Sequence, residues 1–221
     1  MPSKYVVRNF TENAYYHVFN RGVEKRDIFM EENDYLTFLY YLSAYLLPLE
    51  KVLEKYPDLP MRLTGKSLAD EIELIAYCLM PNHFHLLLKQ KTQDGIPKLL
   101  KQLTNAYTLY FNQKTNRVGA LMQGRYKAAP VTEDNLFIHL VRYIHLNPVV
   151  AGISPTLENY RWSSYPDYLG QPVELLVSKK KVLDYFPSVG AFKGFHEDQA
   201  DYERTLEKIK DLSIDWEADK G

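Results

Sequence analysis

Two histidines, His83 and His85, are the side chains in this sequence whose type and spacing most directly suggest chemistry. They follow a Pro81-Asn82 break and begin an apolar run. Alternate side chains of a β-strand point to the same face, so a strand here would place both imidazoles side by side and turn Phe84 into the core. Two imidazoles on one strand face form half of a divalent metal site. On its own, such a pair is more often a hydrogen-bonded structural pair than a metal site.

A second polar group occurs later in the chain, where His139, Tyr143 and Asn147 are spaced four residues apart. With about 3.6 residues in each helical turn, these positions lie on nearly one stripe. If the stripe faces the histidine strand, two imidazoles, an amide oxygen and a phenol share one surface. Neutral imidazoles and an amide carbonyl can hold Mg²⁺ or Mn²⁺ and leave positions for phosphate oxygens. The structural alternatives are a core phenol at Tyr143 and an ordinary helix stop at Asn147-Pro148.

A tyrosine suits one particular reaction at such a site. A phenol has a pKa of about 10 in water and is a poor nucleophile unless a metal polarises the target phosphate. A phosphotyrosine also leaves readily, because a phenolate is a better leaving group than an alkoxide. The phenol therefore fits a cut-and-rejoin reaction that stores the energy of a phosphodiester bond in the protein.

The charge pattern supports a nucleic-acid partner. The overall formal charge is −1, but residues 95–132 contain no Asp or Glu, whereas residues 195–219 are strongly acidic. We expect part of the basic segment to neutralise phosphates and part to be plain surface charge. Arg125 is the favoured contact, Tyr126 is available for base stacking, and Asn20-Arg21 comes next. The other basic residues of the segment are Lys98, Lys101, Lys114, Arg117 and Lys127.

The elements that position these residues can be predicted from periodicity and turn signals. The expected order is β-α-β-β-α-β with an added helix, which is the ferredoxin-like plan of an antiparallel sheet with helices on one face. The strands are expected at 15–20, 72–80, 83–89 and 128–131, and the helices at 33–55 with a break at Pro48, from Pro97 to before Gly119, and from a cap at Asp134 to a stop at Asn147-Pro148.

Length and composition exclude several classes of protein. The chain has 221 residues, one cysteine (Cys78) and no apolar run long enough to span a membrane. An internal disulfide is therefore excluded, and we expect a soluble protein of the reducing cytoplasm. We divide the chain into a main domain, 1–170, and an acidic, mainly helical extension, 171–221, with helices near 182–186 and 196–212. The extension's role stays open between shielding the site, self-association and a passive appendage.

Five stretches together resemble a known family. In chain order they read FNRGVEKRDIF, MPNHFHLLL, QGRYKA, YIHLNPVVAG and YRWSSY. This series is similar to that of the IS200-like single-tyrosine (Y1) transposases of the HUH nuclease class, and most of all to the REP-associated tyrosine transposases. A lone His-hydrophobe-His pattern is loose, whereas separate motifs in the family's order are specific.

The resemblance implies roles for several residues. His83 and His85 would bind the metal, Tyr143 would be the nucleophile, and Asn147 would be the third, polar ligand. The family cuts single-stranded DNA near hairpins, forms a 5′-phosphotyrosine and releases a 3′-hydroxyl. Tyr107 and Tyr110 are rival nucleophiles, but they fall on an apolar helical stripe. Related transposases act as dimers with exchanged helices, so a homodimer and a monomer both remain open.

Arg142 and His145 flank Tyr143 and are expected to point elsewhere, toward DNA or solvent.

The leading function is a metal-dependent, hairpin-directed DNA strand transferase. The alternative is a hairpin-specific DNA-binding protein whose cleavage activity is vestigial or absent. A replication-initiation or relaxase-type nuclease ranks last, because no helicase or paired tyrosine is evident.

Overall fold

A four-stranded antiparallel sheet forms the centre of the computed structural model, which describes residues 10–171 and 176–198. The strand order is β2-β3-β1-β4, so the two strands that are central in space, β3 and β1, come from distant parts of the sequence. Each strand lies within about one residue of its predicted position, and the ferredoxin-like order is as expected. The strands are β1 (Ala14–Arg21), β2 (Ile72–Met80), β3 (His83–Gln90) and β4 (Lys127–Val131).

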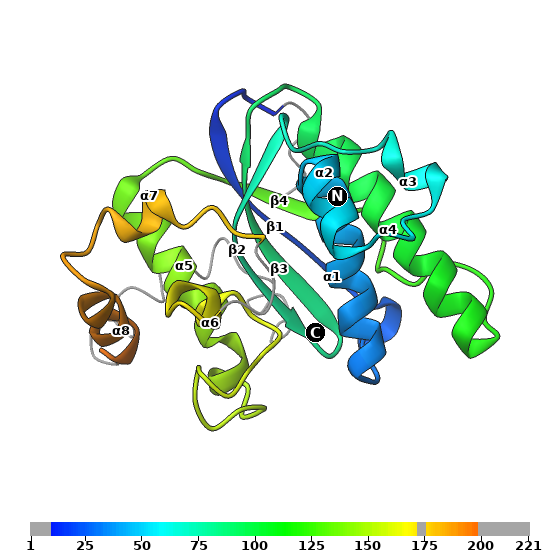
Figure 1. Cartoon of the computed structure of the whole chain (residues 1–221). Coiled ribbons are helices and arrows are strands. Elements are labelled where there is room, and N and C mark those ends of the chain that lie inside the picture. The colour runs from blue at the N-terminus through cyan, green and yellow to red at the C-terminus, as the bar shows by residue number, and fades with distance from the viewer. Residues whose placement is uncertain (1–9, 172–175, 199–221) are drawn as a thin grey trace.

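One face of the sheet is covered by the two longest helices of the first half of the chain, α1 (Glu32–Leu46) and α4 (Gly95–Thr115) (Figure 1). Two short helices, α2 (Leu49–Lys55) and α3 (Met61–Thr64), lie on the same side. Val18, Phe84 and Leu86 point into this core and are fully buried. The even-numbered side chains of β1 and β3 therefore form the first core, as strand alternation requires.

The opposite face is covered by the added helix, α5 (Asp134–Val150), together with α6 (Tyr165–Tyr168), α7 (Lys180–Leu183) and α8 (Val189–Glu197) (Figure 1). Leu87, Leu140 and Ile144 are fully buried in this second core. The two ferredoxin helices thus share one face as predicted, and α5 faces the odd-numbered side chains of β3, which include both histidines. This placement allows α5 to meet the histidine strand.

The expected stop of α5 at Asn147-Pro148 is wrong. The helix continues through Pro148 to Val150, and the backbone N–H of Ala151 closes the last turn on the carbonyl of Asn147 at 2.9 Å. Proline lacks only its own N–H, and the helix accommodates that loss within its final turn. Asp134 is also the first helical residue and not the cap; its carboxylate accepts a hydrogen bond from the Tyr185 hydroxyl at 2.8 Å.

The start of α1 is built around a buried carboxylate, Asp34. It accepts hydrogen bonds from the backbone N–H groups of Met30 (2.8 Å) and Glu31 (3.1 Å). It also receives the Tyr110 hydroxyl at 2.9 Å and the Lys114 ammonium at 2.6 Å, both from α4. The cap is Glu31, two residues before the predicted Asn33, and the helix breaks at Pro48 as expected. Asp34 therefore joins the two helices of the first face.

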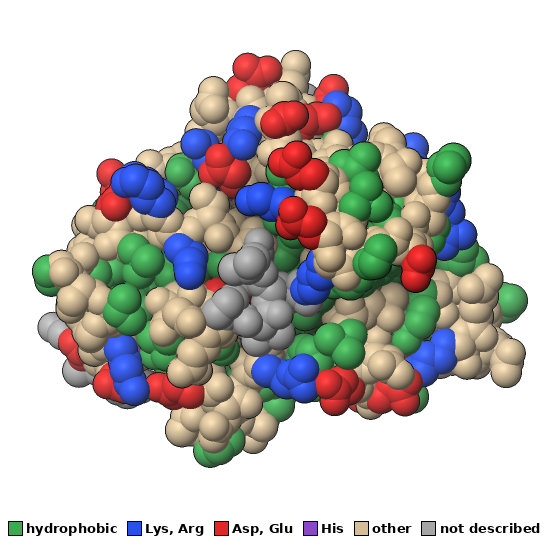
Figure 2. All heavy atoms as spheres, viewed as in Figure 1, with side chains coloured by type: hydrophobic (Ala, Val, Ile, Leu, Met, Phe, Trp, Pro, Cys, Tyr) green, Lys and Arg blue, Asp and Glu red, His purple; other side chains and the backbone are tan. Residues whose placement is uncertain are grey.

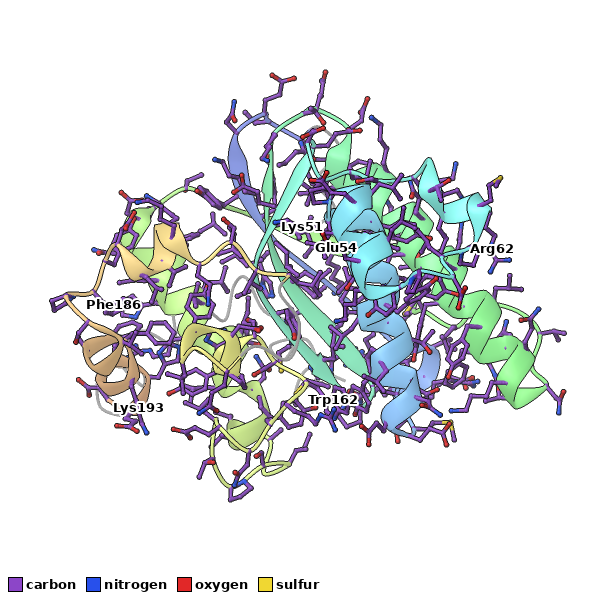
Figure 3. The ribbon with its side chains drawn as sticks, viewed as in Figure 1. Lys51, Glu54, Arg62, Trp162, Phe186 and Lys193 are labelled. Carbon is purple, nitrogen blue, oxygen red and sulfur yellow. The ribbon has the colours of Figure 1, made fainter. Side chains whose placement is uncertain are left out.

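The segment after α5 returns to both sides of the sheet. Trp162, labelled in Figure 3, stacks on Tyr35 of α1 with ring centroids 4.5 Å apart, and its carbonyl accepts the N–H of Leu79 at 2.9 Å. Further along, Val182 and Phe192 are fully buried in the second core. The described part of the predicted extension is thus integral to that core, while most of the helix expected at 196–212 lies outside the described residues.

The surface mixes charges of both signs. On the face drawn in Figure 2, basic and acidic side chains are interspersed over most elements. Among the described residues, no helix is long and apolar enough to cross a membrane. Because the charges are interspersed, the net charge does not locate a nucleic-acid surface, and individual residues must be considered.

Candidate active site

The pairing of β1 with β3 creates a cluster of three histidines on the face covered by α5. Arg21 lies directly opposite His83, and Phe19 lies directly opposite His85, so these four side chains share one face. His17, two residues before Phe19, belongs to the same face. Its Nε2 is 2.9 Å from Nδ1 of His85, and the two rings are stacked with centroids 5.1 Å apart. Both imidazoles are fully buried.

His83 is oriented by the residue before it. Its Nδ1 lies 2.5 Å from the side-chain oxygen of Asn82, whose amide nitrogen donates in turn to the carbonyl of Lys25 at 3.3 Å. An amide oxygen only accepts hydrogen bonds, so Nδ1 of His83 carries the proton and a neutral ring has its lone pair on Nε2. The loop that contains Lys25 is fixed by the N–H of Gly22, which donates to the carbonyl of Asn82 at 2.8 Å. Asn82 therefore determines how His83 presents its second nitrogen.

His85 is held in the neutral form that a metal ligand requires. Burial lowers the pKa of His85 well below its ordinary value, and the neighbouring His83 and His17 lower it further. The Nε2 atom of His85 is buried and has no hydrogen-bond partner among the described residues. A buried imidazole nitrogen without a protein partner is free to bind another group, so Nε2 of His85 is a candidate position for a metal.

Tyr143 brings its phenol to this cluster from α5. Its ring lies edge-on to His85, with centroids 5.8 Å apart, and edge-on to His17 at 6.2 Å. Tyr143 is only 4% exposed. The helix and the histidine strand therefore meet, which the spacing had left as a condition, and Tyr143 faces the histidines.

Asn147 lies one helical turn beyond Tyr143 and is also buried. Its amide nitrogen donates to the backbone carbonyl of Tyr143 at 2.9 Å. This bond fixes the side chain against its own helix and assigns the amide oxygen the accepting role. The oxygen is the atom that could serve as a ligand to a hard cation.

The rest of the predicted stripe and its neighbours behave differently. His139 turns toward α8, where its ring lies 5.3 Å from that of Phe195 and its Nδ1 lies 2.9 Å from the Arg142 guanidinium. The expectation that Arg142 and His145 point to DNA or solvent is wrong, because both are fully buried. Arg142 donates to the carbonyl of Phe195 at 3.0 Å, and His145 bonds to His196 of α8. These residues attach α8 to α5.

The rival tyrosines are far from the histidines in the fold. Tyr107 is fully buried in the first core, on the other face of the sheet, and its hydroxyl donates to the carbonyl of Ile28. Burial strongly raises the pKa of Tyr107. The Tyr110 hydroxyl is bound to Asp34. Both rivals are therefore structural residues, as the apolar stripe indicated.

The donor atoms of His83, His85 and Asn147 are of the kinds that a hard or borderline divalent cation binds. His83 and His85 have their Nδ1 atoms engaged by Asn82 and His17, so their Nε2 atoms are the positions that would face a metal. Asn147 offers an amide oxygen from the facing helix. Among the described residues, no group of three or more His, Cys, Asp or Glu side chains is arranged to hold a metal. A site here would thus rest on two imidazoles and an amide, with open positions for other oxygen ligands.

Several of the predicted DNA contacts meet in a groove on the α4 side of the sheet. Asn20, Lys101, Arg125 and Tyr126 all line this groove, which has a volume of about 350 Å³. The amide of Asn20 donates to the carbonyl of Gly124 at 3.3 Å, which ties the end of β1 to the loop that carries Arg125. Arg125 is exposed, and its guanidinium carbon lies 5.5 Å from the centre of the Tyr126 ring.

The other predicted contacts lie outside this groove. Arg21 and Lys127 are on the histidine face, because Arg21 lies opposite His83 and Lys127 lies opposite Phe19. Lys98 is paired with Glu71 at 2.7 Å. Together with Lys101, it borders a second groove of about 540 Å³ between α3 and α4, near Arg62 in Figure 3.

Two basic residues of the acid-free segment have structural partners instead. Lys114 is bound to Asp34 and Glu31, and Arg117 donates to the side chain of Asn112 at 2.9 Å. They stabilise the ends of α1 and α4.

Two site residues were missed by reasoning from the sequence. His17 lies in a strand that was correctly predicted, and Asn82 was read only as part of a turn. The ferredoxin-like order already implied that β1 is next to β3, and this was the available signal for His17. The register between the strands, which decides whether His17 faces His85, is not encoded in any local pattern.

Comparisons with known proteins agree with the fold and the motifs. Residues 52–147 match the family described as "Transposase IS200 like", and this stretch contains both strand histidines, Tyr143 and Asn147. This stretch is less than half of the chain, and its match to the IS200-like transposase model confirms the resemblance inferred from the motifs. No curated protein sequence matches the chain.

Two solved structures are similar to this chain to different degrees. One, described as "Structure of the REP associates tyrosine transposase bound to a REP hairpin", is 15% identical with a TM-score of 0.50, covering 80% of this chain and 92% of that chain. At this identity the likeness establishes the fold alone, and it confirms the predicted Y1 transposase fold. A putative transposase from Deinococcus radiodurans is 16% identical with a TM-score of 0.36, covering 69% of this chain and 97% of that chain.

Proposed function

We propose that this chain is a metal-dependent single-stranded DNA endonuclease and strand transferase that acts through a covalent 5′-phosphotyrosine. The observation that carries the proposal is the edge-on contact of Tyr143 with His85, 5.8 Å between ring centroids, beside the buried Nε2 atom of His85. The match of residues 52–147 to the IS200-like transposase model supports the reaction class. The proposed metal ligands are His83, His85 and Asn147, and the proposed nucleophile is Tyr143.

The reaction has one bond made and one broken in each step. The phenol oxygen of Tyr143 attacks the scissile phosphorus after losing its proton, and the bond from phosphorus to the 3′ oxygen breaks. That oxygen takes up a proton and leaves as a 3′-hydroxyl, while the 5′-phosphate stays on Tyr143. A 3′-hydroxyl of another strand end can reverse the step and rejoin the DNA. A bound Mg²⁺ or Mn²⁺ supplies polarisation of the phosphate and charge neutralisation.

The chain's own residues hold this arrangement. Asn82 and His17 orient the two histidines, and the bond from Asn147 to the Tyr143 carbonyl stiffens the helix at the nucleophile. Because β1, β3 and α5 are all packed in the core, the phenol and the imidazoles keep their relative positions before DNA arrives. Such preorganisation lowers the entropic part of the barrier.

We place the DNA at the end of the sheet where β1 ends and β3 begins. Asn20 and Arg21 are consecutive, and they lead from the groove of Arg125 to the face of His83. Arg125, Arg21, Lys101 and Lys127 would neutralise phosphates, with Lys98 at the edge, and Tyr126 would stack on a base. The fold shared with a hairpin-bound REP-associated transposase supports a hairpin substrate and membership of that subgroup.

The alternative is a hairpin-binding protein that does not cleave. One observation favours it: Tyr143 is 4% exposed, so little of the residue is open to solvent. Tight hairpin binding without an adduct, in any divalent metal, would establish this alternative.

The decisive experiment looks for the covalent adduct. The full chain is incubated with end-labelled hairpin-bearing single-stranded DNA and Mg²⁺ or Mn²⁺, then denatured and separated by size. We expect a label that stays with the protein, and its loss with Tyr143→Phe or in excess chelator. Tyr185→Phe is the matched control, because it removes an exposed hydroxyl bound to Asp134 and away from the histidines. An adduct that survives in Tyr143→Phe would refute the nucleophile assignment.

A further inference from the structure

We propose that His17 is a positioning residue for the metal ligand His85, acting through the hydrogen bond between Nε2 of His17 and Nδ1 of His85. The proposal rests on the metal-binding role given to His85 above and adds a residue that the sequence motifs do not contain. It also assigns the direction of that hydrogen bond, which the positions of the nitrogen atoms alone leave open.

The contact is close and enclosed. The two nitrogens are 2.9 Å apart, the rings are tilted by only 17° to each other, and both side chains are fully buried. Phe19 packs against His17 with ring centroids 4.9 Å apart, and Tyr143 closes the other side edge-on at 6.2 Å. The surrounding aromatic rings leave the two imidazoles few other orientations. The buried hydrogen bond therefore fixes the ring plane of His85.

The proton count follows from the second nitrogen of His85. A neutral imidazole has one N–H and one lone pair, and a fully buried ring such as that of His85 favours the neutral form. Nε2 of His85 has no hydrogen-bond partner among the described residues, and an unsatisfied buried N–H is costly. The proton therefore lies on Nδ1 of His85, which donates to Nε2 of His17. This arrangement leaves the lone pair of His85 on Nε2, where a metal would need it.

Asn82 performs the same task for His83. Its amide oxygen accepts from Nδ1 of His83 at 2.5 Å, which gives that ring the same tautomer. The two ligands are thus each oriented by an acceptor on Nδ1, one from the turn before β3 and one from the neighbouring strand β1. Acceptors in this position are known to fix the tautomer and raise the basicity of metal-bound histidines.

His17 is assigned as a positioning residue and not as a third ligand. Its Nε2 faces a nitrogen of His85 instead of the space next to His85 Nε2. The described residues also contain no group of three histidine, cysteine or carboxylate side chains that is arranged around a metal. A ligand role for Nε2 of His17 would require it to give up its bond to His85.

The test measures Mn²⁺ binding by titration calorimetry on the full chain without DNA. His17→Leu keeps the bulk but removes the acceptor, and we expect affinity to fall by about 10- to 100-fold. His17→Gln places an amide oxygen within reach of Nδ1 of His85, and we expect it to restore most of the affinity. His196→Leu is the control: it deletes a buried, histidine-bonded imidazole away from the site, and Mn²⁺ affinity should not change.

A second measurement needs no metal. Nitrogen chemical shifts of the imidazoles in the metal-free protein report which nitrogen carries the proton, and we expect His85 to be protonated on Nδ1. Protonation on Nε2 instead, or Mn²⁺ affinity unchanged in His17→Leu, would overturn the proposal. If the expected tautomer is seen but the wild-type chain binds no Mn²⁺, the metal-dependent function fails while the bond direction stands. Loss of affinity in His17→Gln as severe as in His17→Leu would refute the acceptor role.

Discussion

The imidazoles of His145 and His196 are stacked in the second core, with Nδ1 of His145 3.0 Å from Nε2 of His196. The proton positions in this chain of bonds can be assigned. Nδ1 of His196 donates to the carbonyl of Phe192 at 3.0 Å, so its Nε2 accepts from His145. Nε2 of His145 then accepts from the hydroxyl of Ser164 at 2.8 Å. Both rings are neutral, and together they fasten α8 to the helix that carries Tyr143.

Removing His196, which accepts the hydrogen bond from His145, should destabilise the fold. In His196→Leu, the N–H at Nδ1 of His145 is left buried without a partner, and we expect the free energy of unfolding to fall by about 1–3 kcal/mol. Urea denaturation with an unchanged slope is the measurement. Lys193→Ala on the exposed side of α8 breaks only surface pairs with Glu158 and Glu197 and should change stability by less than about 0.5 kcal/mol. Equal losses in the two variants would contradict this account.

The same pair predicts how stability depends on pH. Burial lowers the pKa of His145 well below its ordinary value and that of His196 to about 3. The unfolded chain takes up protons on these rings as the pH falls below about 6.5, whereas the folded chain does not. Stability is therefore complete above that pH and is lost as the pH falls toward the folded pKa values. Each ring contributes a slope of up to about 1.4 kcal/mol per pH unit.

The variant His196→Gln isolates one of these groups. Glutamine retains hydrogen-bonding atoms for His145 but does not titrate, so the loss of stability between about pH 6 and about pH 4.5 should be shallower than in the wild type. Unfolding curves at a series of pH values give the slope. This window excludes Asp34, whose stabilising charge is lost only at lower pH. An identical slope in both proteins would show that His196 does not titrate on unfolding.

Asp34 should be one of the most sensitive positions in the first core. Burial alone would raise its pKa, but hydrogen bonds from Lys114, Met30, Tyr110 and Glu31 outweigh burial and hold the pKa below its ordinary value. We expect Asp34→Ala to lower the free energy of unfolding by about 2–4 kcal/mol, because those donors lose their shared acceptor. Glu32→Ala, which removes an exposed pair with Arg161, is the matched control in the same turn.

Asn82→Ala tests the orientation of His83, the other proposed metal ligand. The substitution frees Nδ1 of His83 and also removes the bond to the carbonyl of Lys25. We expect Mn²⁺ affinity to fall by about 10-fold or more, with adduct formation reduced at limiting metal and recovering at high metal. Asn159→Ala, in an exposed loop, should match the wild type. Wild-type affinity in Asn82→Ala would mean that the turn does not orient His83.

Arg125→Ala should weaken DNA binding without affecting the metal. If Arg125 contacts one phosphate, its loss should reduce the slope of log K against log[salt] by about 0.7 on single-stranded DNA. Fluorescence anisotropy of a labelled hairpin at several salt concentrations measures both affinity and slope. Lys51→Ala, on α2 in Figure 3, is an exposed control remote from the groove. The same slope in all three proteins would remove Arg125 from the interface.

The strands and helix α5 were predictable, because they depend on period-two and helical patterns that local sequence expresses directly, whereas the contact of α5 with the histidine strand was only a condition. The burial or exposure of individual polar residues could not be predicted in this way. Arg142 and His145 read as surface positions beside Tyr143, yet they are buried because α8, far along the chain, brings its own partners to them. Burial of a polar residue is set by such distant complementary groups.

The helix stop at Asn147-Pro148 failed for a related reason. A proline usually ends a helix, but near the last turn it removes only one bond, and Asn147 lies inside the helix where its side chain can bond to Tyr143. His17, which reasoning from the sequence missed, illustrates a further limit of prediction from local patterns. Its strand was predicted correctly, but the register against β3 depends on how two distant segments pair.

Strand β1 carries His17 to one face and Asn20 to the other, so a single stretch of backbone serves both the histidine cluster and the groove of Arg125. Inserting or deleting one residue between them would exchange the faces of every side chain beyond that point. A substitution at Asn20 that alters the groove therefore keeps the spacing to His17, whereas a change in the length of this stretch alters both faces of the sheet together.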